Sequence, residues 1–128
     1  MSDITTERLV LSGLVLSDSF INASLPFVQE EYFHSRAEQA VFEVIKKYLD
    51  QYGAPPKQNA LIIDLKNHEN LNSRDTTHAI AVAEDIYSIN VCELDPKWLL
   101  DQCESFCQSK AIYNAIQKTI AIYDGTED

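Results

Sequence analysis

The most constraining feature of this sequence is a long stretch near its C-terminus that contains no helix breaker. No glycine or proline occurs between Pro96 and Gly125. Asp95 supplies an N-cap acceptor and Pro96 stands at the first helical position, a pair that favours the start of a helix. We therefore predict one helix of roughly 28 residues, about 42 Å long at a rise of 1.5 Å per residue. Since an average helix has only about 12 residues, this one should extend beyond a core built from shorter helices.

The predicted long helix carries large apolar residues at a heptad interval. Four of them follow one another every seven positions: Leu99, Phe106, Tyr113 and Ile120. An apolar stripe on a helix that outreaches its own core favours pairing with another helix. The predicted oligomer interface comprises these four residues and their neighbours Trp98 and Ile116. The alternative is a core helix that its own domain covers completely.

The residues before the long helix are predicted to form a head of about five short helices. Only 3 glycines and 4 prolines occur in 128 residues, about half the usual share, which disfavours a fold rich in turns. The expected helices cover approximately residues 5–17, 18–21, 36–52, 58–67 and 74–88, with Asp3 or Thr5, Asp18, Ser35, and Asn72 or Ser73 as caps. The expected fold class is all-α: a compact bundle in residues 1–92 followed by one long C-terminal helix in residues 93–128.

The third of these short helices has the clearest start and stop signals. Ser35 and Glu38 form a capping box, in which each side chain satisfies a free backbone N–H at the helix start. Behind it, apolar residues repeat with the helical period: Ala37, Val41, Val44, Ile45, Tyr48 and Tyr52. Gly53 supplies a left-handed stop and is followed by two prolines. Inside the first helix, Gly13 costs about 1 kcal/mol relative to alanine, which predicts a close helix contact there.

Charge and composition exclude several classes of function. Acidic residues outnumber basic ones by 20 to 10, which gives a net charge of −10. Such a chain repels the phosphate backbone, so direct nucleic-acid binding is not expected. The three glycines are widely separated, and no glycine-rich loop precedes Lys118 and Thr119, which excludes a phosphate-cradling loop. No apolar run approaches the ~20 residues of a membrane span, so we expect a cytoplasmic protein without membrane contact.

No group of residues has the spacing of an active site or a metal centre. Cys103 and Cys107 are four residues apart, but structural zinc needs four ligands, and Cys92 and the three histidines have no paired spacing. An odd number of cysteines without secretion features indicates reduced thiols. None of the histidines stands near a recognisable nucleophile motif. We therefore expect no catalytic, cofactor or metal site in this chain, and predict a function in association.

The ordered set of segments resembles the N-terminal domain of DnaB-family replicative DNA helicases, in particular the branch of T-even-type bacteriophages. The resemblance covers nearly the whole chain. It rests on residues 7–14 (ERLVLSGL), 31–33 (EYF), 40–47 (AVFEVIKK), 52–61 (YGAPPKQNAL), 98–99 (WL) and 111–115 (AIYNA). Bacterial members usually carry a histidine where Glu38 and Gln39 stand, and an acidic residue where Pro56 and Lys57 stand, so these positions favour the phage branch.

The resemblance implies an architectural part of a ring helicase. Members of this family pair through helical heads and hairpins to form a collar of six subunits above an ATP-dependent motor ring. The collar recruits primase and, in phages, a helicase loader. The long helix would be the first arm of such a hairpin. The motor domain, with its ATP and Mg²⁺, is expected to be absent from this chain. Four acidic residues are candidates for partner docking: Glu30, Glu31, Glu38 and Glu43.

Two other classes of function remain open from the sequence. A small acidic phage protein could inhibit a host factor or mimic DNA, although its acids are spread around the predicted helices instead of lying on one face. A hydrolase without a recognisable motif is the third possibility, and the missing nucleophile and metal patterns disfavour it.

Overall fold

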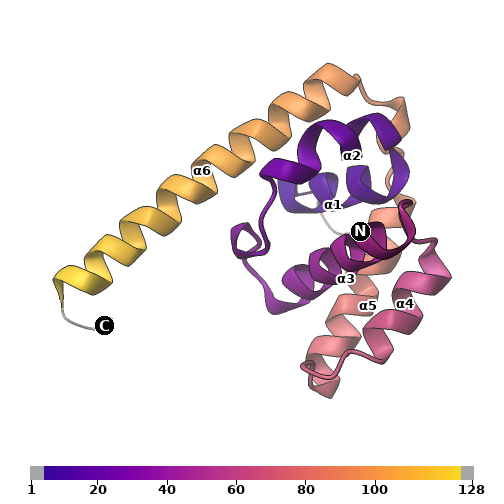
Figure 1. The fold of residues 1–128 in the computed structure, drawn as a ribbon, viewed down its shortest axis with the longest axis horizontal. Coiled ribbons are helices and arrows are strands. Elements are labelled where there is room, and N and C mark those ends of the chain that lie inside the picture. Colours follow the sequence, from indigo (N-terminus) through magenta and orange to yellow (C-terminus); the bar gives the residue numbers. More distant parts are fainter. Residues whose placement is uncertain (1–4, 125–128) are drawn as a thin grey trace.

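The computed structural model describes residues 5–124 and is all-α within that range. Six α-helices and three short 3-10 turns follow one another along the chain (Figure 1). Their bounds, in chain order, are α1 Thr6–Leu16, α2 Asp18–Ser24, η1 Leu25–Phe27, η2 Glu30–Tyr32, α3 Arg36–Tyr52, α4 Gln58–Lys66, α5 Ser73–Ser88, η3 Val91–Glu93 and α6 Pro96–Tyr123. The predicted fold class is confirmed.

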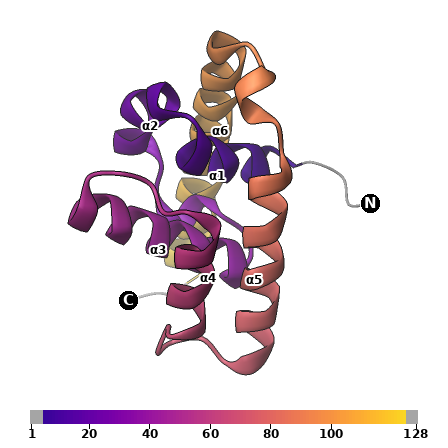
Figure 2. The ribbon, with the colours of Figure 1, turned by 90° about the vertical axis from the view of Figure 1, so that its right-hand side faces the viewer.

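The molecule consists of a head formed by α1 to α5 and a rod formed by α6. The rod starts beside α2 and continues well past the head (Figure 1). Seen from the side, α3, α4 and α5 lie together below α1 and α2 (Figure 2). α1 is the central helix, because it packs against α2, α3, α5 and α6. This arrangement explains why α1 is apolar on most of its sides.

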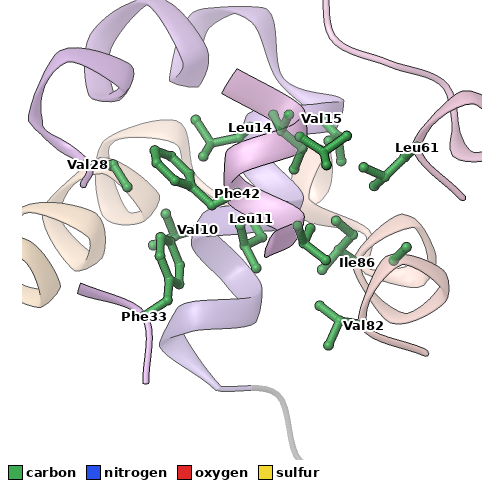
Figure 3. Packing of buried hydrophobic residues seen from close by; sticks show 14 of the residues in the cluster. Val10, Leu11, Leu14, Val15, Val28, Phe33, Phe42, Leu61, Val82 and Ile86 are labelled. Atoms are coloured by element: carbon green, nitrogen blue, oxygen red, sulfur yellow. The ribbon is translucent and has the colours of Figure 1, made fainter. Parts of the chain in front are cut away.

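The core of the head is formed where α1, α3, α4 and α5 meet (Figure 3). Leu11, Phe42 and Ile86 belong to its largest fully buried side chains. The buried hydroxyl of Ser12 donates to the carbonyl of Ile86 at 2.7 Å, which joins α1 to α5 and satisfies a polar group that would otherwise be costly to bury. The core therefore joins helices that are far apart in the sequence.

Most helix starts lie where the sequence predicts them. The side chains of Thr5, Asn72 and Asp95 accept hydrogen bonds from the first turns of α1, α5 and α6. The predicted cap of α2 is wrong: Ser17, not Asp18, accepts from the backbone N–H of Phe20. That helix also continues to Ser24 instead of ending near residue 21. Asp3, the other cap considered for α1, lies outside the described residues.

Helix α3 begins at the predicted Ser35 cap and ends at the predicted Gly53, but Glu38 accepts from the Ser35 hydroxyl at 3.3 Å instead of from a backbone N–H, so only the serine half of the predicted capping box forms. The last turn of α3 is not part of the core. The Ser35 hydroxyl accepts from the backbone N–H of Glu38 at 3.1 Å, and Gly53 ends the helix with a left-handed φ of 73°. Tyr52, which the helical period placed on the apolar face, is exposed. The centres of the Tyr52 and Tyr48 rings are 4.5 Å apart. Tyr52 is exposed because α3 extends beyond the helices that cover its apolar face.

Gly13 lies at the close contact that the sequence predicts, between α1 and α2. A Cβ at this position would come within 2.5 Å of the Phe20 ring. We expect Gly13→Ala to lower the free energy of unfolding by about 1–3 kcal/mol through overpacking, although alanine is the better helix former. Urea unfolding followed by circular dichroism measures this change. Relief of the loss in a Gly13→Ala/Phe20→Leu double variant is the matched control, and a Gly13→Ala variant more stable than the parent would contradict the prediction.

Candidate protein-binding surface on the long helix

The N-terminal half of α6 is part of the core of the head. Its buried side chains are Leu99, Cys103, Phe106 and Cys107. The Phe106 ring lies 5.6 Å from that of Phe33 and 6.5 Å from that of Tyr32. Leu99 and Phe106 are only 3% and 6% exposed. Their assignment to an oligomer interface therefore needs correction, because contacts within the same chain already occupy both side chains.

The C-terminal half of α6 extends beyond the head. The Asn114 side-chain amide donates to the backbone carbonyl of Glu31 at 3.2 Å, and beyond this point the helix extends away from the head (Figure 1). Large apolar side chains in this half are about half exposed or more: Ile112, Tyr113, Ile116, Ile120, Ile122 and Tyr123. Water-exposed apolar side chains that gather on one element are typical of a protein interface.

Most of these side chains share one face, which we call the distal stripe: Ile112, Tyr113, Ile116, Ile120 and Tyr123. Spacings of three and four residues place them on the same side of a helix. Trp98 is 45% exposed and lies five helical turns from Ile116, hence in the same direction. Polar Gln102, Ser105 and Ser109 separate Trp98 from the stripe on this face. Ile122 faces another side of α6.

The sequence prediction found only part of the distal stripe. It included Tyr113, Ile116 and Ile120, all of which the structure brings onto one exposed face. It missed Ile112, which lies outside the seven-residue series, and Tyr123, which follows Ile116 by seven residues but was not included in the predicted interface. The signal that finds them is the spacing of four residues from Ile112 to Ile116 and Ile120 and of three residues from Ile120 to Tyr123, which marks one side of a helix without reference to a heptad.

The distal half of α6 differs in charge from the rest of the chain. Residues 105–123 contain Lys110 and Lys118 and no acidic residue, whereas acids exceed bases by 20 to 10 over the whole sequence. The projecting helix is thus apolar and mildly basic, while the acidic residues concentrate elsewhere. Asp124 follows directly at the C-cap of α6, so the acidic residues lie before and after this segment and not within it.

The four acidic candidates for partner docking do not form one free surface. Glu38 is buried, and its carboxylate accepts from Arg8 at 3.2 Å and from the Ser35 hydroxyl at 3.3 Å. Neighbouring residues hold Glu43: the Arg36 guanidinium forms an ion pair with its carboxylate at 3.8 Å, and the His68 imidazole lies at 3.4 Å. The placement of Glu38 contradicts its proposed role as a docking residue, because Glu38 holds α3 to α1.

Glu30 and Glu31 lie exposed on η2. Burial and a hydrogen bond with Glu43 raise the pKa of the Glu30 carboxyl above its ordinary value. Because Glu30 and Glu43 interact, they form one local acidic cluster on η2 and α3. Of the four candidates, Glu30 and Glu31 are the two for which the structure gives no ion pair within the described residues.

The cysteines and histidines form no shared site. The thiols of Cys103 and Cys107 are buried on α6, where Cys107 contributes most to raising the pKa of Cys103. Exposed Cys92 donates its thiol to the carbonyl of Leu16 at 3.2 Å. No group of three or more potential metal ligands occurs in residues 5–124. In the same range no single helix is long and apolar enough to cross a membrane, and the one pair that reaches the length, α1 with α2 and η1, is bent by 115°.

Comparison with known proteins identifies the family. The model of the DnaB-like helicase N-terminal domain matches residues 1–93. The DnaB-like replicative helicase of Enterobacteria phage T4 is 29% identical over 120 residues, which cover 94% of this chain and 24% of the relative. This chain therefore spans about a quarter of the length of that relative, and the alignment extends into most of α6. The match to the family model over most of its residues shows that the chain belongs to the DnaB-like helicase N-terminal domain family.

Proposed function

We propose that this chain acts as the self-associating collar domain of a phage replicative helicase. The observation that carries the proposal is the distal stripe, five large apolar side chains on a helix that extends beyond its own head. Family membership supports it, because the relative from phage T4 is a replicative helicase. The chain would contribute architecture, and the motor chemistry would belong to a different domain.

The size of the stripe matters for this proposal. Moving one isoleucine from water into an apolar contact contributes about 1.5–3 kcal/mol, while association costs about 4–15 kcal/mol in lost freedom of motion. One side chain is therefore too little, and the distal stripe as a whole has to be covered. Ile116 lies at its centre, with Ile112 and Ile120 one turn away on either side, so a charge at Ile116 would disrupt the whole contact.

The decisive measurement is the mass of the chain in solution. We expect sedimentation at tens of micromolar to give a species larger than the 14.5 kDa monomer, and an Ile116→Asp/Ile120→Asp variant to sediment as the monomer. Both side chains are about half exposed, so the variant should retain its helix content by circular dichroism.

A matched control is available on the head. Ile63 on α4 is 56% exposed, similar to Ile116 at 52%, but it lies outside the distal stripe. Ile63→Asp introduces the same charge at a similarly exposed isoleucine and should leave the mass of the parent unchanged. Equal masses for the parent and the stripe variant would refute self-association through α6.

We further propose that the acidic head docks a basic surface of a replication partner, a primase or a helicase loader. The exposed carboxylates on η2, Glu30 and Glu31, support this assignment, together with the excess of acidic residues. Such docking should weaken as salt concentration rises, because exposed charges are screened within about 8 Å at physiological ionic strength. Direct binding to nucleic acid is not part of this proposal, because the net charge of −10 opposes it.

A further inference from the structure

Two of the three cysteines are neighbours on α6, in a groove between that helix and the end of α2 that we call the α2–α6 groove. Cys103 and Cys107 are four residues apart, which places them on the same side of the helix. Their thiols share a hydrogen bond. Both residues line the α2–α6 groove, which has a volume of about 490 Å³. The groove therefore gives a small ion a route to two neighbouring sulfur atoms.

The surroundings of the two thiols are mostly apolar. The other apolar residues that line the α2–α6 groove are Ala23, Phe27, Tyr32, Leu100 and Ala111. Phe27 stands at its edge with 68% of its surface exposed, whereas Cys103 and Cys107 are only 2% and 8% exposed. The sulfur atoms are thus shielded from most of the solvent, which limits competition by water for a ligand that binds sulfur.

The spacing of the two cysteines does not suit a disulfide. Side chains four residues apart on a helix have Cβ atoms about 5–6 Å apart, whereas a disulfide requires Cβ atoms about 3.5–4.5 Å apart. The two sulfur atoms therefore stay unbonded while α6 is helical. An ion held in line between two sulfur atoms, with metal–sulfur bonds of about 2.3 Å, separates them by about 4.6 Å and fits the wider spacing.

The number of available ligands determines which metal ion fits. Structural zinc and iron–sulfur clusters require four protein ligands, and no group of three or more potential ligands occurs in residues 5–124. Soft thiolate ligands favour Cu(I), a closed-shell ion that accepts two sulfur ligands in a line. The sequence argument against zinc does not apply to such an ion, because two thiolates complete its coordination.

We propose that Cys103 and Cys107 bind one Cu(I) ion in the α2–α6 groove. Two thiol protons pass to the solvent, two sulfur–copper bonds form, and the copper keeps its oxidation state. The bound ion links two successive turns of α6 in the half of the helix that packs against the head. The site does not include the distal stripe, so this inference goes beyond the self-association proposed above and does not depend on it.

Competition with a coloured chelator tests this site. The probe is Cu(I) bound to bicinchoninate, kept reduced by ascorbate in the absence of oxygen. We expect the folded chain to withdraw one equivalent of Cu(I), which bleaches the chelator complex. Cys103→Ser and Cys107→Ser should each weaken this transfer by about tenfold or more, since loss of even an outer partner of a metal ligand has an effect of that size. Cys92→Ser removes the exposed thiol and should leave the transfer unchanged.

A control of identical composition exchanges Cys107 with Ser109, an exposed residue of the same helix. Cys107→Ser/Ser109→Cys keeps three cysteines but places the second thiol six residues from Cys103, about 120° away around the helix. We expect this variant to bind Cu(I) as weakly as Cys107→Ser. Parent-like binding by the exchanged variant would overturn the site, because it would show that the positions of the thiols do not matter.

Two other results would also overturn the site. One is a parent chain that leaves Cu(I) on the chelator, and the other is a Cys92→Ser variant that loses as much binding as Cys103→Ser. Circular dichroism of each variant checks folding. Cys103→Ala and Cys107→Ala replace the serine variants if a buried hydroxyl lowers the helix content.

Discussion

Replacing Phe106 by alanine should lower the free energy of unfolding by about 3–5 kcal/mol, the usual loss for a buried phenylalanine. The ring is 6% exposed and packs against Phe33 and Tyr32. These contacts join α6 to the segment that precedes α3. A loss of this size is a large part of the 5–15 kcal/mol that stabilises a typical domain. Urea unfolding followed by circular dichroism at low micromolar concentration measures it.

The control is another phenylalanine near the same helix. Phe27 is 68% exposed, so Phe27→Ala should change the free energy of unfolding by no more than about 0.5 kcal/mol. A similar loss in both variants would contradict the buried position of Phe106. The comparison also shows why a charge at Phe106 would be a poor test of self-association. A charge at this buried position would disrupt the packing of α6 against the head, whether or not it changed a contact between copies.

Replacing Arg8 by methionine should cost about 2–3 kcal/mol, because it leaves a carboxylate without its cation in a largely buried position. The Arg8 side chain is 27% exposed and that of Glu38 only 10%. The Arg8 guanidinium also donates to the Asp85 carboxylate. This one side chain on α1 therefore connects α3 to α5. Thermal and urea unfolding of Arg8→Met report the loss, since methionine keeps most of the apolar stem.

Two comparisons isolate the charge. An Arg8→Met/Glu38→Gln double variant should lose less stability than Arg8→Met alone, because glutamine removes the uncompensated charge. Lys97→Met removes one side of the exposed pair with Asp101, where the charged atoms are 4.0 Å apart, and should change stability by no more than about 0.5 kcal/mol. Equal losses in Arg8→Met and Lys97→Met would show that the buried carboxylate does not depend on Arg8.

Local signals in the sequence predicted the helices well, because they act within one turn. The side chains of Ser35 and Asp95 satisfy free backbone N–H groups only a few residues further along the chain. Gly53 ends α3 by adopting a left-handed backbone conformation. The length of α6 follows from the absence of a breaker between residues 96 and 125. The cap of α2 shows where local signals are not sufficient. Ser17 and Asp18 are neighbours and both are good N-cap residues, so the sequence does not indicate which of them caps the helix.

The interface residues were harder to predict, because a seven-residue interval does not stay on one side of a straight helix. Each heptad turns by about 20° relative to the helix axis, so Leu99 and Ile120 differ in direction by about 60°. The early members of the series point into the head, and the later ones belong to the exposed distal stripe. The seven-residue periodicity can be read from the sequence. The position at which the head stops covering α6 cannot, because it depends on the tertiary structure.

The sequence by itself determined the all-α fold, most of the caps and the long uninterrupted α6, since these depend on hydrogen bonds and backbone preferences between near neighbours. Only the tertiary structure decided which apolar and acidic side chains are free. Phe106 and Glu38 became internal because Phe33 and Arg8, distant in the sequence, fold onto them. Ile116 and the groove beside Phe27 remained open because no element of the described chain reaches them. Burial depends on contacts between distant segments, which a local pattern does not specify.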